Sequence, residues 1–183
     1  MNTWPRCVIL LAAAGCITGA SQPTTVILVR HAEREPLLTP DPELSEAGRS
    51  RAEALASAAR EAGVRAIIIT QFVRTRETAE LLANALGIMP EIVPDTGAGH
   101  AKDVANLILR KHAGQTVLVI GHGHTIPAIM RALGVRAPQP SICENQYDLI
   151  FLVSVAPPDS TRVLRARYGA ATPADSLCLA VRR

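Results

Sequence analysis

The sequence reads TTVILVRHAE at residues 24–33. Val26 to Val29 form an uninterrupted aliphatic run, and a run without polar alternation is typical of a strand buried on both faces of a parallel sheet. Arg30 and His31 follow this run directly. Because ligands bind beyond the carboxyl ends of the strands in parallel α/β sheets, the end of this strand is the first candidate for a functional site.

Strand and helix patterns alternate along the rest of the chain. Aliphatic runs predict strands at 66–70 and 116–120, and apolar residues at helical spacing, each set followed by a glycine, predict helices over 45–62, 74–86, 102–112 and 125–133. Late strands are expected at 149–155, 162–168 and, more weakly, 177–181, the first two as a hairpin beside the parallel set. This alternation predicts a three-layer α/β/α domain with a mostly parallel central sheet.

Three strand ends carry the same kind of side chain. Arg30 and His31 follow the first strand, Arg74 comes shortly after the second, and Gly-His-Gly-His follows the third at 121–124. Helices begin after the second and third strand ends, and helix N-termini favour anions. The sequence therefore predicts a cationic pocket at one edge of the sheet, with phosphate as its natural ligand.

Composition narrows the function classes. The chain has 183 residues, enough for one sizeable core, and 48% of them are hydrophobic. Aromatic residues make up only 3%, which argues against a base-stacking nucleic-acid platform. The formal net charge is +3 and the basic residues are dispersed along the chain, so charge gives no indication of nucleic-acid binding.

The first 21 residues have the order of a secretory signal. Arg6 precedes an apolar run at 7–14, and small residues follow. This run is shorter than the ~20 residues that span a bilayer. The stretch Ala-Ala-Gly-Cys ending at Cys16 resembles a lipobox, which would make Cys16 a lipidated membrane anchor; the alternative is cleavage after Ala20. We therefore expect an exported protein, periplasmic or membrane-anchored, with one domain at 22–183.

Two cysteines besides Cys16 remain in the expected mature chain, Cys143 and Cys178. In an oxidising compartment they could form a disulfide. Separate buried thiols are the alternative.

The motifs at the strand ends resemble the histidine phosphatase superfamily, also called phosphoglycerate-mutase-like. Residues 29–33, Val-Arg-His-Ala-Glu, are similar to its signature, with alanine in place of the commoner glycine. Further similar segments follow in the family's order at 44–52, 74–79 and 121–122. The resemblance covers about residues 24–168, is greatest to small exported bacterial members, and implies a phosphoglycerate-mutase-like fold.

The chemistry of phosphoester hydrolysis assigns roles to these residues. It needs a nucleophile, cations for the phosphoryl oxygens and a proton for the leaving group. We expect His31 to be the nucleophile, kept neutral by neighbouring arginines. Arg30, Arg74 and His122 would bind the non-bridging oxygens. The resemblance implies the same assignments and implies neither metal nor cofactor.

The proton donor is open at this stage. Asp95 fits best, because it follows a short apolar run on the chain after Arg74. Glu91, His100 and Glu33 are the alternatives, and Asp95 could instead only begin a turn. We expect His124 to cap a helix or to line the pocket.

Two segments could border the pocket. The proline-rich stretch 36–42 is a candidate specificity loop, with a plain connector as the alternative, and 144–147 could also contact the pocket.

A zinc hydrolase is a competing interpretation of the histidines. His122 and His124 have a chelating spacing, and His31 with Asp95 would complete a site. Adjacent arginines would repel a dication, however, while they attract phosphate.

The sequence thus predicts a metal-independent phosphomonoester hydrolase that acts on a small phosphorylated substrate through a phosphohistidine at His31. Its enzymatic alternatives are a phosphohistidine-protein phosphatase and a mutase-like phosphotransferase. From another class, a non-catalytic anion-binding module is the alternative.

Overall fold

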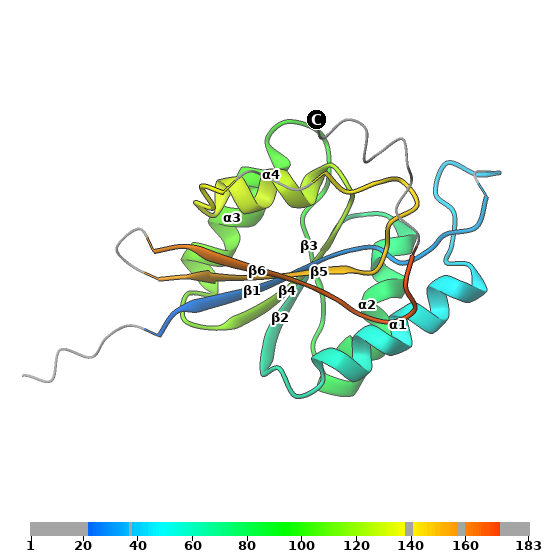
Figure 1. Ribbon diagram of the computed structural model, residues 1–183, viewed down its shortest axis with the longest axis horizontal. Coiled ribbons are helices and arrows are strands. Elements are labelled where there is room, and N and C mark those ends of the chain that lie inside the picture. The colour runs from blue at the N-terminus through cyan, green and yellow to red at the C-terminus, as the bar shows by residue number, and fades with distance from the viewer. Residues whose placement is uncertain (1–21, 37, 138–140, 157–159, 173–183) are drawn as a thin grey trace, which may run out of the picture.

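The computed structural model describes residues 22–36, 38–137, 141–156 and 160–172 (Figure 1). The predicted signal with Cys16, the segment 177–181 and Cys178 lie outside these residues. Within the described part of the chain, no helix combines the length and the apolar character that a membrane crossing requires.

One sheet of six strands, in the order β3-β2-β4-β1-β5-β6, forms the centre of the molecule. The pairs β1–β4, β2–β4 and β2–β3 are parallel, while β1–β5 and β5–β6 are antiparallel. The mostly parallel sheet and the late hairpin are therefore as predicted. The strands are β1 (Thr24–Arg30), β2 (Val64–Ile69), β3 (Glu91–Ile92), β4 (Thr116–Gly121), β5 (Leu149–Val155) and β6 (Arg162–Arg167).

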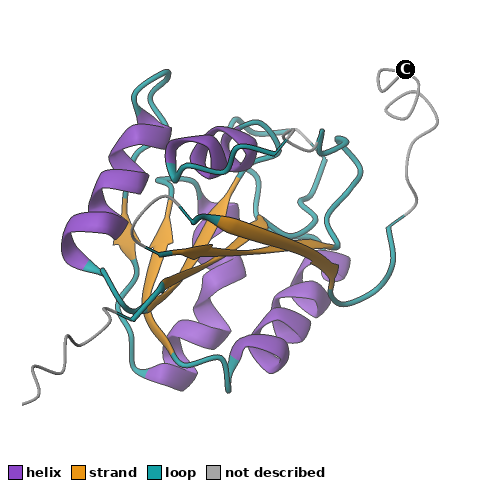
Figure 2. Ribbon diagram, turned by 60° about the vertical axis from the view of Figure 1, so that its left-hand side comes forward, coloured by secondary structure: helices purple, strands orange, loops and turns teal. Residues whose placement is uncertain are grey.

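Helices pack against both faces of the sheet (Figure 2). Side chains alternate along β1, so that Val26 and Leu28 join the core under α3 and α4, while Ile27 and Val29 join the core under α1 and α2. All four side chains are at most 3% exposed, which explains why the strand is aliphatic throughout. The helices are α1 (Glu46–Ala59), α2 (Val73–Leu86), α3 (His100–Lys111) and α4 (Thr125–Ala132).

The structure differs from the sequence-based prediction at element boundaries. Helix α1 ends at Ala59 and not at Ala62, because a turn leads to Gly63, whose φ of 68° directs the chain into β2. The sequence also did not predict β3, which pairs with the last two residues of β2, Ile68 and Ile69. A strand of two residues is too short to show a period.

The start of α1 is packed against the chain that follows β1. Ser45 is the N-cap, as expected, and its Oγ accepts a hydrogen bond from the Gly48 backbone N at 3.2 Å. A Cβ atom at Gly48 would lie 1.9 Å from the carbonyl oxygen of Glu33. This close approach is possible only for glycine, and it joins the first helix to the segment that carries His31.

Replacing Gly48 by alanine should therefore destabilise the fold. We expect Gly48→Ala to lower the free energy of unfolding by about 2 kcal/mol, the usual cost of overpacking, although alanine is the better helix former. Urea unfolding measures this change. Ser50→Ala, at an exposed position of the same helix, is the control and should be neutral or slightly stabilising. Equal stability of both variants would show that the packing at Gly48 is not tight.

Candidate active site

The parallel strands bring the predicted motifs to one edge of the sheet. Strand β4 lies between β1 and β2, and Arg30 pairs with Gly121 in the β1–β4 register. His31 and His122 follow these two residues, and their ring centroids are 5.3 Å apart. The carboxyl ends of neighbouring parallel strands thus place two imidazoles side by side, as the sequence predicted.

A cavity of about 540 Å³ opens at this edge. Three of its lining residues are arginines and one is a carboxylate, so the cavity is cationic, which favours an anionic ligand. The sequence-predicted Arg30, His31, Arg74 and His122 all line it. The complete lining consists of Arg30, His31, Arg34, Pro40, Arg74, His122, Gly123, His124, Pro127, Ser141, Ile142 and Glu144.

His31 is held in one tautomer. Its Nδ1 lies 2.8 Å from the carbonyl oxygen of Ala32, and since a carbonyl can only accept, Nδ1 carries the proton. The lone pair is therefore on Nε2. Burial lowers the pKa of His31 to about 2, further lowered by the charges of Arg30, His122 and Arg74 and partly offset by the Ala32 hydrogen bond. His31 is thus a neutral imidazole with a free nucleophilic nitrogen.

Arg30 is oriented by the backbone of the segment before β5. Its Nη1 donates to the carbonyl oxygens of Cys143 at 2.8 Å and Glu144 at 2.7 Å, and its guanidinium lies 4.3 Å from the centre of the Tyr147 ring. Carbonyl dipoles and a ring face hold this cation without neutralising it. The expected contact of residues 144–147 with the pocket is therefore confirmed.

The exposed carboxylate of Glu144 faces two of the arginines. Its Oε1 lies 3.3 Å from Nη2 of Arg30 and 3.5 Å from Nη2 of Arg34. Its side chain is 84% exposed, so the pairing is weak. A bound phosphate would compete with this carboxylate for the same donors.

Arg74 is paired with a carboxylate from the loop between β1 and α1. Asp41 accepts hydrogen bonds from the Val73 backbone N at 3.0 and 3.1 Å and from Nη1 of Arg74 at 3.3 Å. The N-terminus of α2 does attract an anion, but the anion is this carboxylate and not the predicted phosphate. The buried Nε atoms of Arg30 and Arg74 have no hydrogen-bond partner among the described residues.

The loop at 36–42 therefore does more than connect two elements. Its base is closed by a bridge between Arg34 and Leu44, and it contributes Pro40 to the cavity wall and Asp41 to the start of α2. Sequence reasoning did not single out Arg34 or Asp41. Arg34 could have been found, because it follows Arg30 by four residues at the same strand end. Asp41 could not, because its partners Val73 and Arg74 are distant in sequence.

His122 is a second neutral imidazole. Its Nε2 lies 3.2 Å from the Thr70 hydroxyl, and the Phe72 ring packs edge-on against it. Burial lowers the pKa of His122 to about 3, and the charge of Arg74 lowers it further, while Asp95 opposes this. A neutral imidazole retains one N–H and can still donate to a phosphoryl oxygen.

Asp95 lies beside the two histidines that follow β4. Its Oδ2 is 4.0 Å from Nε2 of His122 and 3.3 Å from Nε2 of His124. Its backbone N donates to Oε1 of Gln71 at 2.8 Å. Asp95 thus contacts the site but is not among the residues that line the cavity.

The other acids considered from the sequence are engaged elsewhere. Glu33 forms a two-pronged ion pair with the buried Arg51, at 2.7–3.0 Å. Glu91 bonds Lys111 at 2.6 Å and His112 at 2.8 Å. His100 is buried, with Nδ1 3.2 Å from the Pro94 carbonyl oxygen. None of the three lines the cavity.

His124 occupies the N-cap position of α4, but its side chain makes no capping hydrogen bond. It lines the cavity instead, which is the second of the two roles expected from the sequence. Within the described ranges, no three His, Cys, Asp or Glu side chains are placed to hold a metal ion.

Comparisons with known proteins agree with this geometry. Residues 26–97 match the profile of the histidine phosphatase superfamily, branch 1. The matched region begins in β1 and includes His31, Arg74 and Asp95. No curated protein matches the sequence significantly.

Solved structures of similar fold cover more of the chain. "Mycobacterial hydrolase 1" is 17% identical, with a TM-score of 0.63, over 82% of this chain and 100% of that one. A mycobacterial glucosyl-3-phosphoglycerate phosphatase is 19% identical, with a TM-score of 0.59, over 80% and 99%. The protein histidine phosphatase SixA complexed with tungstate is 14% identical, with a TM-score of 0.62, over 78% and 96%. At these identities the comparison establishes the fold.

The two buried neutral histidines should make stability depend on pH. Their folded pKa values lie below the ordinary value of 6.5, so between pH 6.5 and about 3 the unfolded chain binds more protons and stability falls as pH falls. From pH 7.5 to 5 we expect a loss of about 2 kcal/mol per buried histidine. Urea unfolding at both pH values should show a smaller loss for His31→Gln than for the wild type.

The exposed substitution Arg131→Gln on α4 is the control and should keep the wild-type pH dependence. An unchanged dependence in His31→Gln would mean that His31 is not buried in its neutral form.

Proposed function

We propose that this protein hydrolyses phosphomonoesters through a covalent phosphohistidine formed on His31. The observation that carries the proposal is the single neutral tautomer of His31, whose Nε2 is free at a cavity lined by Arg30, Arg34 and Arg74. Cations attract a phosphate dianion, and the neutral imidazole attacks it. Structures of similar fold contain tungstate in SixA and VO3 in the mycobacterial phosphatase, and oxyanions of this kind are the ligands that we expect here.

The reaction has two steps. In the first, Nε2 of His31 forms a bond to phosphorus, and the bond from phosphorus to the ester oxygen breaks, leaving its electron pair on that oxygen, which takes up a proton. In the second, water attacks the phosphohistidine, the electron pair of the P–N bond returns to Nε2, and inorganic phosphate leaves. The hydrogen bond to Ala32 keeps Nε2 directed at the phosphorus in both steps.

Arg30, Arg74 and His122 would stabilise the transition state. Charge on the three non-bridging oxygens must be balanced, and donors that are already oriented do this most effectively. Arg30 needs no reorientation, because backbone carbonyls already fix its guanidinium. Asp95, which lies beside His122 and His124, is the acidic side chain that we assign to proton transfer to the leaving group. No metal ion has a part in this scheme.

A small phosphorylated substrate fits the cavity volume of about 540 Å³. A phosphohistidine on a protein is the second candidate substrate, since the structure of SixA, a protein histidine phosphatase, has a similar fold. Arg34 and Glu144 at the cavity wall would contact the part of the substrate beyond the phosphate.

Hydrolysis of p-nitrophenyl phosphate tests the proposal. We expect turnover by the wild type, inhibition by vanadate, no effect of EDTA, and an acid-labile phosphoryl group on the quenched enzyme. His31→Ala should lose at least ~10³-fold in kcat while remaining folded, because no other group can form the covalent intermediate. Arg131→Gln is the control. Full activity of His31→Ala would refute the mechanism, and sensitivity to EDTA would favour a metal hydrolase.

We also propose that the protein is exported and anchored to a membrane through a lipidated Cys16. The support is the order of charge, apolar run and small residues in the first 21 positions. Expressed in a bacterium, the full chain should fractionate with membranes, and Cys16→Ser should release it to a soluble fraction. Membrane association of both forms would contradict the lipid anchor.

A further inference from the structure

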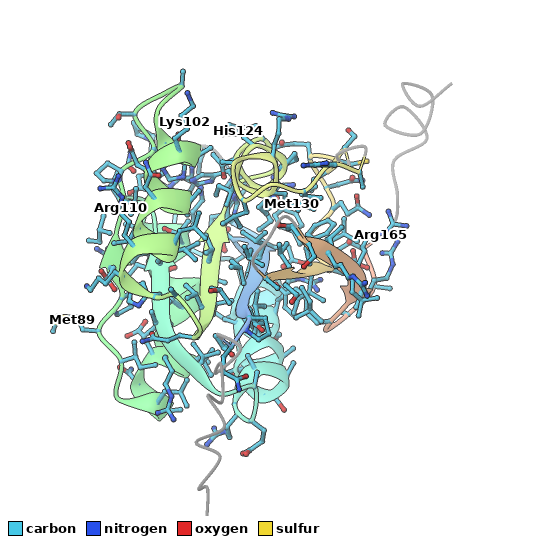
Figure 3. All side chains as sticks on the ribbon, turned by 90° about the vertical axis from the view of Figure 1, so that its left-hand side faces the viewer. Met89, Lys102, Arg110, His124, Met130 and Arg165 are labelled. Atoms are coloured by element: carbon cyan, nitrogen blue, oxygen red, sulfur yellow. The ribbon has the colours of Figure 1, made fainter. Side chains whose placement is uncertain are left out.

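Two histidines follow β4, and the structure places them in different environments. His122 is buried, while the His124 side chain is 75% exposed. The two rings are stacked, with centroids 5.7 Å apart and planes at 11°. Figure 3 shows His124 at the upper end of the molecule, near the beginning of α3 marked by Lys102. The His122 ring is therefore enclosed by protein, whereas the His124 ring is in contact with solvent.

His124 is directly paired with Asp95. Nε2 of His124 lies 3.3 Å from Oδ2 of Asp95, whose side chain is only 12% exposed. Gln71 holds the backbone at Asp95, since its Oε1 accepts from the Asp95 backbone N at 2.8 Å. A carboxylate paired with an imidazole in this way orients the ring.

His124 lies at the cavity wall, whereas Asp95 does not. His124 lines the cavity together with His31, Arg74 and His122, and Asp95 does not. The ionic contact of His124 with Asp95 uses Nε2 and not Nδ1. Its side chain also makes no cap to α4, so helix stability does not account for a histidine at this position.

We propose that His124, held by Asp95, is the group that protonates the leaving oxygen; this inference rests on the phosphohistidine mechanism proposed above. As the P–O bond breaks, its electron pair goes to the leaving oxygen, which takes the proton from Nδ1 of His124. In the second step, neutral His124 regains a proton from the attacking water, whose oxygen bonds to phosphorus. His124 is a catalytic residue in this scheme, and Asp95 is a positioning residue.

Leaving groups of different basicity separate this role from a structural one. p-Nitrophenolate leaves without a proton, whereas the alkoxide of glycerol 2-phosphate needs one. For His124→Gln we expect kcat/KM to fall at least ~100-fold on glycerol 2-phosphate and less than ~5-fold on p-nitrophenyl phosphate, because general acid catalysis contributes only where the leaving group is poor. Asp95→Asn should show the same selectivity with a smaller loss. Adding Asp95→Asn to His124→Gln should change little further.

Arg131→Gln, on the helix that follows His124, is the control and should keep wild-type rates on both substrates. Circular dichroism and urea unfolding check the fold of each variant, and His124→Asn is a second substitution at this exposed position. An equal loss on both substrates, no loss, or selectivity in Asp95→Asn alone would each overturn the role of His124. A wild type inactive on both substrates would instead refute the proposed phosphatase function itself.

Discussion

The imidazole of His31 has to remain uncharged between guanidinium groups, and the rest of the site is arranged around this requirement. Burial supplies most of the lowering of the His31 pKa, because a protonated ring would be a cation shielded from water. The charges of Arg30 and Arg74 lower this pKa further. The hydrogen bond to Ala32 would by itself favour the charged ring. Its contribution is directional, since it settles which nitrogen carries the lone pair.

The arginines of the site are held by partners of different strength. Arg30 donates to two backbone carbonyls, while its contact with the exposed Glu144 carboxylate is weak. Arg74 is tied to Asp41, which also binds the first backbone N–H of α2. The loop that carries Asp41 is thereby joined both to Arg74 at the cavity and to the start of α2.

Much of the fold could be predicted because the signals that specify it are local. The aliphatic runs of β1, β2 and β4 mark buried parallel strands, and Ser45 and Gly63 mark the two ends of the region that contains α1. The two-residue β3 and the early end of α1 could not be predicted, because both depend on how the chain turns and not on periodicity. Arg30, His31, Arg74 and His122 were predictable for a related reason. Arg30 is the last residue of β1 and the other three come shortly after a strand, and parallel strands bring such residues to one edge.

The sequence by itself determined the order of strands and helices and the chemistry placed at each strand end, since both are encoded in consecutive residues. Only the tertiary structure decided the partners of those groups: Asp41 with the start of α2, Glu33 with Arg51, and Asp95 with His124. These pairs join segments 18 to 32 residues apart along the chain. Side-chain partners at such separations depend on how loops pack in three dimensions, for which a one-dimensional pattern carries no signal.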